Sequence, residues 1–557
     1  MSEAVFKKYD QHQMSLLPES LEDLIPERHL VRVVNEMIDG MNIDSLISTY
    51  KGGGTSSYHP RMMIKVLVYS YTQKKYSSRE IAKALRENIN YMWISGRNRP
   101  DFRTINTFRS SRLKECVDNV FASLLELLVK EKLVKIEDYF VDGTKFEADA
   151  KRHSYVWKKT MERNKGIVQG KIKELIKHIE EVNAEEEKSY GSRDLEELGE
   201  SSEITSDKIR EKVKELDVIL KESVKKTETL ESEKVEKEAT KKSKQQSKQI
   251  SKTKRQLERH LIPKLIKYET QEKILGERNS YSRTDPEATF MRLKNGGRKN
   301  GELRACYNVQ MGTENQYIVC YSLHQNASDS TTMISHMEKL KKLIMGAMKS
   351  KEPKLPMNIS ADAGYGSEEN YEYLEKAEVN AYVKYNTFEK ERRGKKNSNE
   401  FHKDNLPYDA ARDEYKCPSD RLLKYKCTET SKTQTGYEVT KRIYECESCA
   451  DCSLRESCHK SKDNRRIEIN EKLRKYRTKA RELLLSETGQ TYRKRRNTEI
   501  EPTFGDIKQN RQYRRIRLRG KKKANIEIGL ISMAHNLIKM WSEQMNRFNS
   551  KLVAVAH

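Results

Sequence analysis

The sequence of 557 residues has no apolar run long enough to cross a bilayer. Its first residues, MSEAVFKKYDQHQMSLLP, also lack the basic-then-apolar order of a secretory signal peptide. These two absences predict a soluble protein that stays in the cytoplasm. Hydrophobic residues make up 35% of the chain and charged residues another 35%, so we expect two to four structural units whose cores are diluted by very polar segments.

Acidic residues are too few to balance the basic ones. The chain has 109 Lys and Arg against 84 Asp and Glu, a formal net charge of +25. Between residues 491 and 523 there are thirteen Lys and Arg against three acids. Such a concentrated excess favours a nucleic-acid partner, bound in a strongly salt-dependent way, over a lysine-rich surface that only aids solubility.

Disulfides are not expected among the nine cysteines of a cytoplasmic chain, which leaves free thiols or a metal site. Cys116, Cys306 and Cys320 are scattered, whereas six cysteines lie between residues 417 and 458. Two C-x-x-C steps in this cluster fit tetrahedral Zn²⁺. The expected ligands are Cys417, Cys446, Cys449 and Cys452, with Cys458 or His459 as substitutes; reduced free thiols are the alternative.

Four regions follow from composition and periodicity. Residues 1–130 predict short helices, with Ser77 and Glu80 forming a capping box and Thr104 capping a later helix. They suit either a helix-turn-helix type DNA reader or an ordinary helical bundle. Residues 151–284 predict a charged helical hairpin or coiled-coil arm. Its charged surface is either only solvated or in contact with DNA. Residues 391–484 form a Cys-rich insertion, and 131–150, 285–390 and 485–545 form an α/β core with a mixed sheet.

Two aspartates are expected at strand ends within this core. Asp142 lies at or near the end of a strand over 136–146, and Asp362 ends the strand in LPMNISADAGY. The order of three strands, helix, strand, helix, strand and a late helix is that of a ribonuclease H-like fold. The first and fourth strands would then bring the two aspartates together. Glu501, on the late helix, would complete a set of carboxylates for two divalent ions.

Five blocks in this order resemble the transposases of bacterial insertion sequences, in the DDE class with a Tyr-Arg-Glu-Lys signature. They are YHPRMMIKVLVYSYTQKKYSSREIAKAL, VDGTKFEA, LRACYNVQMGTENQYIV, ISADAGYGSEENYEYL, and EIEPTFGDIKQNRQYRRIRLRG followed by NIEIGLISMAHNLIKM. The resemblance covers most of the chain and implies an N-terminal DNA-binding domain before the catalytic core.

The resemblance also implies roles for single residues. Asp142, Asp362 and Glu501 would bind the metal ions. The residues that would contact phosphate or DNA are Tyr492, Arg496, Lys508, Arg514 and Arg515. The signature spacing fits Tyr492, Arg495 and Glu499 better, but Lys508 would then be too distant, so Glu501 is preferred. Asp329 is a candidate support near the site, and Asn308 is interpreted as structural.

The function that the resemblance implies is cut-and-paste transposition. The enzyme would cleave double-stranded DNA at terminal inverted repeats and join the 3′-hydroxyl to target DNA, as a homodimer or larger assembly. Two Mg²⁺ ions, which Mn²⁺ can replace, would be its cofactors. The alternatives are a structure-specific nuclease on the same fold and a catalytically inactive protein that only binds DNA.

Overall fold

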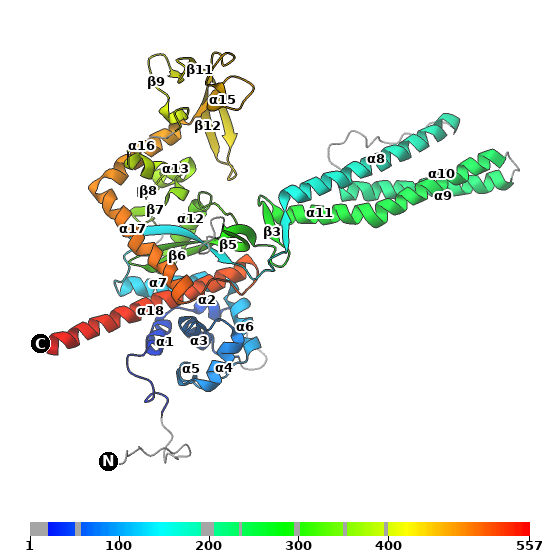
Figure 1. Cartoon of the computed structure of the whole chain (residues 1–557). Helices are drawn as coiled ribbons and strands as arrows, with labels where there is room; N and C mark the ends of the chain where they lie inside the picture. The colour runs from blue at the N-terminus through cyan, green and yellow to red at the C-terminus, as the bar shows by residue number, and fades with distance from the viewer. Residues whose placement is uncertain are drawn as a thin grey trace, which may run out of the picture. The chain divides into compact units, whose positions relative to one another are not determined.

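The computed structural model divides the chain into two compact units, Met1–Asp149 with Cys306–His557 and Ala150–Ala305 (Figure 1). Helices and a mixed sheet confirm the α/β prediction. The first 19 residues, on which the signal-peptide expectation rests, lie outside the described residues. The structure describes residues 20–50, 57–190, 205–232, 237–293, 301–348, 354–394 and 399–556.

Short helices fill the N-terminal region, as the sequence predicts. The predicted capping box of Ser77 and Glu80 is present at the start of α4. The prediction of Thr104 as a cap is wrong: Asp101 caps α6, and its carboxylate accepts the backbone N–H of Thr104, because an aspartate three residues earlier already supplies the acceptor. The helices are α1 Leu30–Gly40, α2 Asp44–Ile47, α3 Pro60–Thr72, α4 Ser78–Glu87, α5 Ile89–Ile94, α6 Phe102–Ser110, η1 Arg112–Lys114 and α7 Val117–Lys130.

A mixed sheet forms the centre of the first unit. Its strands there run in the order β6-β5-β1-β7-β8. β5 is antiparallel to both β1 and β6, whereas β1, β7 and β8 are parallel. The predicted hairpin is therefore confirmed as β5 and β6. The strands are β1 Asp138–Glu147, β5 Glu302–Glu314, β6 Tyr317–His324, β7 Asn358–Ala361 and β8 Asn380–Val383.

Helices connect the parallel strands and cover the sheet. α12 Met333–Met348 leads from β6 to β7, and α13 Glu368–Lys376 leads from β7 to β8. The late helix is α17 Glu487–Gly505, which a π-helical turn, η6 Asp506–Asn510, continues. The remaining helical segments are η4 Ala363–Tyr365, α14 Phe388–Arg392, α16 Glu471–Leu485 and α18 Lys521–Ala556.

The Cys-rich insertion has a five-stranded antiparallel sheet of its own, in the order β13-β12-β11-β10-β9. Tyr415, Leu423, Tyr444, Ile467 and Ile469 supply most of its small apolar core. Its elements are η5 Lys403–Asn405, β9 Tyr408–Asp409, β10 Glu414–Lys416, β11 Leu422–Lys432, β12 Glu438–Cys446, α15 Arg455–Cys458 and β13 Arg466–Ile469.

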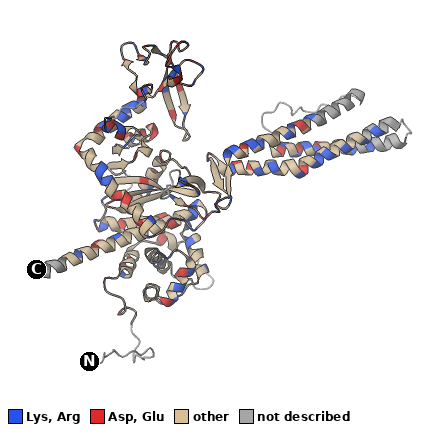
Figure 2. Cartoon of the chain, in the orientation of Figure 1, with Lys and Arg blue, Asp and Glu red and all other residues tan. Residues whose placement is uncertain are grey.

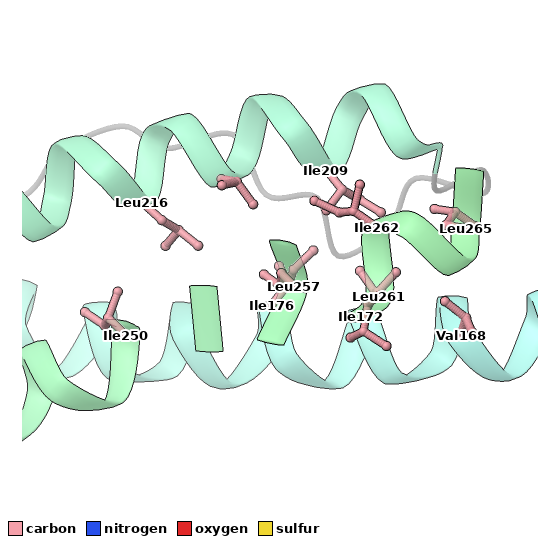
Figure 3. Close-up of a cluster of buried hydrophobic side chains, with 11 residues drawn as sticks. Val168, Ile172, Ile176, Ile209, Leu216, Ile250, Leu257, Leu261, Ile262 and Leu265 are labelled. Atoms are coloured by element: carbon pink, nitrogen blue, oxygen red, sulfur yellow. The ribbon is translucent and has the colours of Figure 1, made fainter. Parts of the chain in front are cut away.

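The second unit is a helical arm that starts from three short strands. It has three helical rods rather than the two of a hairpin: α8, α9, and a continuous run of α10, η3 and α11. Ile172, Ile209, Leu257 and Leu265 are among the buried residues that hold the rods together (Figure 3). The elements are β2 Tyr155–Trp157, α8 Lys158–Tyr190, α9 Ser206–Ser232, α10 Lys237–Gln256, η3 Leu257–Leu261, α11 Ile262–Leu275, β3 Ser280–Ser282 and β4 Thr289–Leu293. In the described residues, no helix is both long and apolar enough to cross a membrane.

The carboxylate of Glu314 fixes the entry into β1. It is buried and accepts four consecutive backbone N–H groups, from Lys135, Ile136, Glu137 and Asp138, at 2.6–3.0 Å. Successive N–H groups that converge in this way form an anion-binding nest. Ile136 has a left-handed φ of 62°, which is strained for a β-branched residue. The four charge-assisted hydrogen bonds offset that strain.

We expect Glu314→Ala to lower the free energy of unfolding by at least about 3 kcal/mol, because four backbone N–H groups, one in a buried hydrogen bond and three in partly buried ones, lose their acceptor. Glu314→Gln should cost about half as much, since its single amide oxygen still accepts two of them. The exposed side chain of Glu137 provides the control, and Glu137→Ala should change little. Urea unfolding of the three variants checks this order; equal losses for Glu314→Ala and Glu314→Gln would contradict it.

Candidate active site

Asp142 and Asp362 lie side by side on neighbouring strands. The parallel pairing of β1 with β7 ends at Val141 opposite Ala361; Asp142 is the next residue of β1, and Asp362 directly follows β7. Adjacent strands are about 4.8 Å apart, so the two carboxylates share one small region. Asp142 is not at the end of β1 as expected, because β1 continues to Glu147 by pairing with β5 after β7 has ended.

One guanidinium group compensates this pair of like charges. Nη2 of Arg496, a buried residue of α17, lies 2.8 Å from Oδ2 of Asp142. Burial nevertheless raises the pKa of Asp142 to about 6. Arg496 and the N–H of Gly143 oppose this shift, whereas the nearby carboxylates of Asp362 and Asp329 add to it. The site therefore favours a proton, or another cation, at this position.

Asp329 is a third carboxylate beside the pair. Its Oδ1 accepts hydrogen bonds from the side-chain amides of Asn308, at 2.8 Å, and Gln310, at 2.9 Å. It packs so closely on Gly143 that a Cβ there would lie 2.4 Å from Oδ1. The glycine after Asp142 is thus required by the approach of Asp329. The position of Asp329, in the loop between β6 and α12, gave the sequence no periodic signal that could place it here.

Helix α17 is attached to the sheet through Asp138, at the start of β1. Tyr492 donates its hydroxyl to Oδ1 of Asp138 at 2.5 Å, and Arg495 pairs with Oδ2 at 2.5 Å. The Tyr492 ring stacks on Tyr382 of β8 with centroids 4.3 Å apart. These contacts hold the helix across the sheet, and they place Arg496 one position further on, against Asp142.

Glu499 and Glu501 point in different directions from α17. The buried Glu499 accepts the backbone N–H of Gln316 at 2.7 Å, in the turn between β5 and β6. That turn lies beside the start of β1, about four residues or 13 Å from Asp142. Glu501 is exposed on another side of the helix. The Glu499 carboxylate is therefore occupied by the Gln316 N–H and by Arg495, which lies 3.6 Å away.

Glu501 lies on one stripe of the helix with Arg493 and Asn497, at spacings of four residues, and Lys508 lies seven residues, about two turns, further along. Both ends of the stripe contact residues near the carboxyl ends of parallel strands. Arg493 lies over the ring of Phe388, shortly after β8, at 5.4 Å. Lys508 donates to the hydroxyl of Thr144 and, at 2.9 Å, to the carbonyl of Lys145. Glu501 lies between these two contacts along the helix, and its side chain is exposed.

The basic residues after Glu501 divide into buried and exposed ones. Burial lowers the pKa of Lys508 to about 8. Arg514 donates Nε to the carbonyl of Lys508 at 3.0 Å, which closes the loop after the π-helical turn. Arg515 pairs with Asp149 at 3.0 Å, and its side chain remains about half exposed. Both arginines lie at the surface, within reach of a polyanion.

The donor set suits a hard divalent cation. Asp142 and Asp362 offer carboxylate oxygens from adjacent strands, the ligand type that Mg²⁺ prefers. No three His, Cys, Asp or Glu side chains in the described part of the chain lie close enough to share one ion. The arrangement is therefore a pair of ligands, with Asp142 paired to Arg496 and Glu501 turned to solvent.

Five of the six clustered cysteines line one cavity of about 20 Å³ in the insertion, together with His459. Burial and the neighbouring Cys449 raise the pKa of the Cys446 thiol to about 12. Both ring nitrogens of His459 are buried without a hydrogen-bond partner. Cys452 contacts the Ser419 hydroxyl at 3.3 Å, and Cys458 accepts from Arg465 at 3.1 Å. The remaining cysteine of the cluster, Cys427, lies on β11 outside this set.

Comparison with protein families gives two matches. Residues 19–111 match a transposase domain (DUF772), and residues 416–541 match a transposase DDE domain. Searches of curated proteins and of solved structures return no match. The two family matches indicate a transposase and confirm the resemblance to the DDE class. Glu501 and Lys508 lie inside the second matched range, whereas Asp142 and Asp362 lie outside both.

The pKa of Asp142 leads to a prediction for Asp362→Asn in metal-free protein. Because the pKa of Asp142 is raised by folding, the folded state binds a proton that the unfolded state releases between about pH 4 and 6, so stability falls as pH rises through this window. Removing the charge of Asp362 lowers the pKa of Asp142. The midpoint of thermal unfolding should therefore rise at pH 7.5 and stay unchanged at pH 4. An equal shift at both pH values would contradict this origin.

Proposed function

We propose that the protein is a DNA transposase that cleaves DNA at the ends of an insertion sequence and joins the freed 3′-hydroxyl to target DNA. The observation that carries the proposal is the adjacency of Asp142 and Asp362 on the parallel strands β1 and β7. Transposase family models that match the sequence before β1 and after β7 support the proposal.

The strand order supports a ribonuclease H-like core. β1, β5, β6, β7 and β8 correspond to strands one to five of that fold, whose sheet order is 3-2-1-4-5 with the second strand antiparallel. We assign residues 131–150, 285–390 and 485–545 to this core. The helical residues 1–130 would read the terminal repeats, and 151–284 and 391–484 are insertions.

Asp142, Asp362 and Glu501 are the residues that would hold Mg²⁺. When bound, a pair of such ions lowers the pKa of the attacking water or 3′-hydroxyl and stabilises the leaving oxygen. Glu501 is preferred to Glu499 because Glu499 is committed to the N–H of Gln316. Asp142 must exchange its contact with Arg496 for one with the cation. Arg496 is then free to hold a substrate phosphate at the same place.

Other basic residues would position the DNA strand. Lys508 lies beside Thr144, two residues beyond Asp142, where its ammonium group can contact a phosphate near the scissile bond. Arg514 and Arg515 extend this contact along the surface. Tyr492 acts mainly on the protein side, since its hydroxyl is bonded to Asp138. Cleavage at paired ends requires at least a dimer, so that each end is held before chemistry starts.

The first test is strand cleavage of a duplex that carries one terminal repeat, in Mg²⁺. Asp142→Asn, Asp362→Asn and Glu501→Gln should each lower the rate by about 10³-fold or more, on the scale of losing a charge-stabilising group, and leave DNA binding intact. Glu487→Gln, an exposed glutamate in the first turn of the same helix, is the control and should cleave normally.

The outcomes separate the alternatives. Cleavage that survives Asp362→Asn would overturn the site assignment. Binding of the repeat without cleavage by the unaltered chain would favour the DNA-binding protein, and cleavage without joining would favour the nuclease.

We also propose that the cysteine cavity holds a structural Zn²⁺. Four ligands would come from Cys417, Cys446, Cys449, Cys452, Cys458 and His459, which line the cavity and would have to close further around the ion, since no three of them share one metal position in the described structure. Thiolates and imidazole in this number suit tetrahedral zinc, which would fix the apolar core of the insertion.

Metal analysis of the purified chain should find one zinc per molecule. Cys446→Ser should lose it, with earlier unfolding of the insertion, whereas Cys427→Ser should keep it because Cys427 does not line the cavity. A zinc-free chain with an intact insertion would contradict the proposal.

A further inference from the structure

The excess of basic over acidic residues in the arm is concentrated on one helix. α10 has eight Lys and Arg against one acid. The other arm helices are balanced: α8 has eight basic and seven acidic residues, α9 has seven of each, and α11 has three and two. Figure 2 shows basic and acidic residues mixed along the balanced rods. The excess on α10 is thus a local feature of one rod.

The basic side chains of α10 form a continuous ridge. Lys241, Lys244, Lys248, Lys252 and Arg255 are all exposed and follow one another at spacings of three or four residues. At 1.5 Å per residue the ridge is about 21 Å long. Ile250 and Leu257, which lie half a turn away, are buried in the core of the arm (Figure 3).

A role in solubility alone does not account for this pattern. Like charges at i and i+4 destabilise a helix, and α8 and α9 show that this arm can be made soluble with mixed charges. The uncharged residues on α10 are mainly Ser and Gln. They do not neutralise the positive charge of the lysines, although they can donate hydrogen bonds. A bound polyanion would offset repulsion between these like charges.

We infer that this ridge is a second DNA-binding surface, which contacts the phosphate backbone of a duplex and belongs to a different unit from the one that carries Asp142 and Asp362. Its length corresponds to about six base pairs at 3.4 Å each. Five point charges on flexible stems match a backbone rather than base edges, so the contact is independent of sequence. The inference rests on the proposed function, because it assigns part of the DNA to the arm.

The test measures binding of the full chain to a 60-base-pair duplex of arbitrary sequence by fluorescence anisotropy, in EDTA, over a range of KCl concentrations. In the ridge variant, Lys241, Lys244, Lys248, Lys252 and Arg255 are replaced by Gln. In the matched control, Lys171, Lys173, Lys214, Lys264 and Lys267 are replaced by Gln; these are exposed lysines of the helices with balanced charge, α8, α9 and α11, so both variants lose five charges from the same arm.

The ridge variant should lose about 0.9 from the slope of log K against log [KCl] for each phosphate contact removed, up to about 4.5, and should bind at least about tenfold more weakly than the control at 150 mM. Equal slopes and affinities in the two variants would overturn the inference. A change in oligomeric state without DNA, seen by sedimentation in the ridge variant alone, would also overturn it, because the ridge would then contact a second copy.

Metal-dependent cleavage separates this inference from the proposed function. The ridge variant should cleave a short terminal duplex at low salt like the unaltered chain. If the unaltered chain shows the ridge-dependent slope but never cleaves, the transposase proposal fails and the DNA-binding ridge remains. If the unaltered chain cleaves and the ridge and control variants have equal slopes, the inference of a DNA-binding ridge fails and the transposase proposal remains.

Discussion

The parallel pairing of β1 with β7 is the constraint on which the site depends. It places Asp142 of β1 beside Asp362, which directly follows β7, so the sheet fixes the spacing of their backbones one residue beyond the last paired position. Asp329 adds a third charge nearby through Asn308 and Gln310. Burial raises the pKa of Asp142, the like charges of Asp362 and Asp329 add to the shift, and perturbed carboxylates of this kind mark functional sites.

Helix α17 balances that charge and is itself held by ion pairs. Arg496 neutralises Asp142, while Arg495 and Tyr492 bind Asp138 four residues earlier on β1. Further along, the hydroxyl of Tyr513 donates to the buried carboxylate of Glu527 on α18 at 2.8 Å. The same carboxylate lies 3.5 Å from Arg109 in the N-terminal helices. These contacts join the N-terminal helices to the chain that follows α17.

Periodicity and motif spacing predicted the parts of the fold that depend on local patterns. The capping box at Ser77 and the β5–β6 hairpin are confirmed, because helix caps and alternating strands are short-range signals. Thr104 failed as a cap because Asp101 is equally suited and comes first.

Contacts between distant segments were not visible in the sequence. Nothing near Glu314 shows that it binds four N–H groups before β1, and nothing near Arg496 shows that it pairs with Asp142 rather than with a phosphate. Spacing alone also left Glu499 and Glu501 open. Only the packing of α17 shows that Glu499 is directed to the Gln316 turn.

The most direct measurement of the central claim is anomalous diffraction at the manganese edge from crystals of the chain soaked in Mn²⁺. We expect a peak between the carboxylates of Asp142 and Asp362, with Arg496 displaced from Asp142 and Glu501 turned toward the metal. An empty site between the aspartates, with the Arg496–Asp142 pair intact at saturating Mn²⁺, would contradict it.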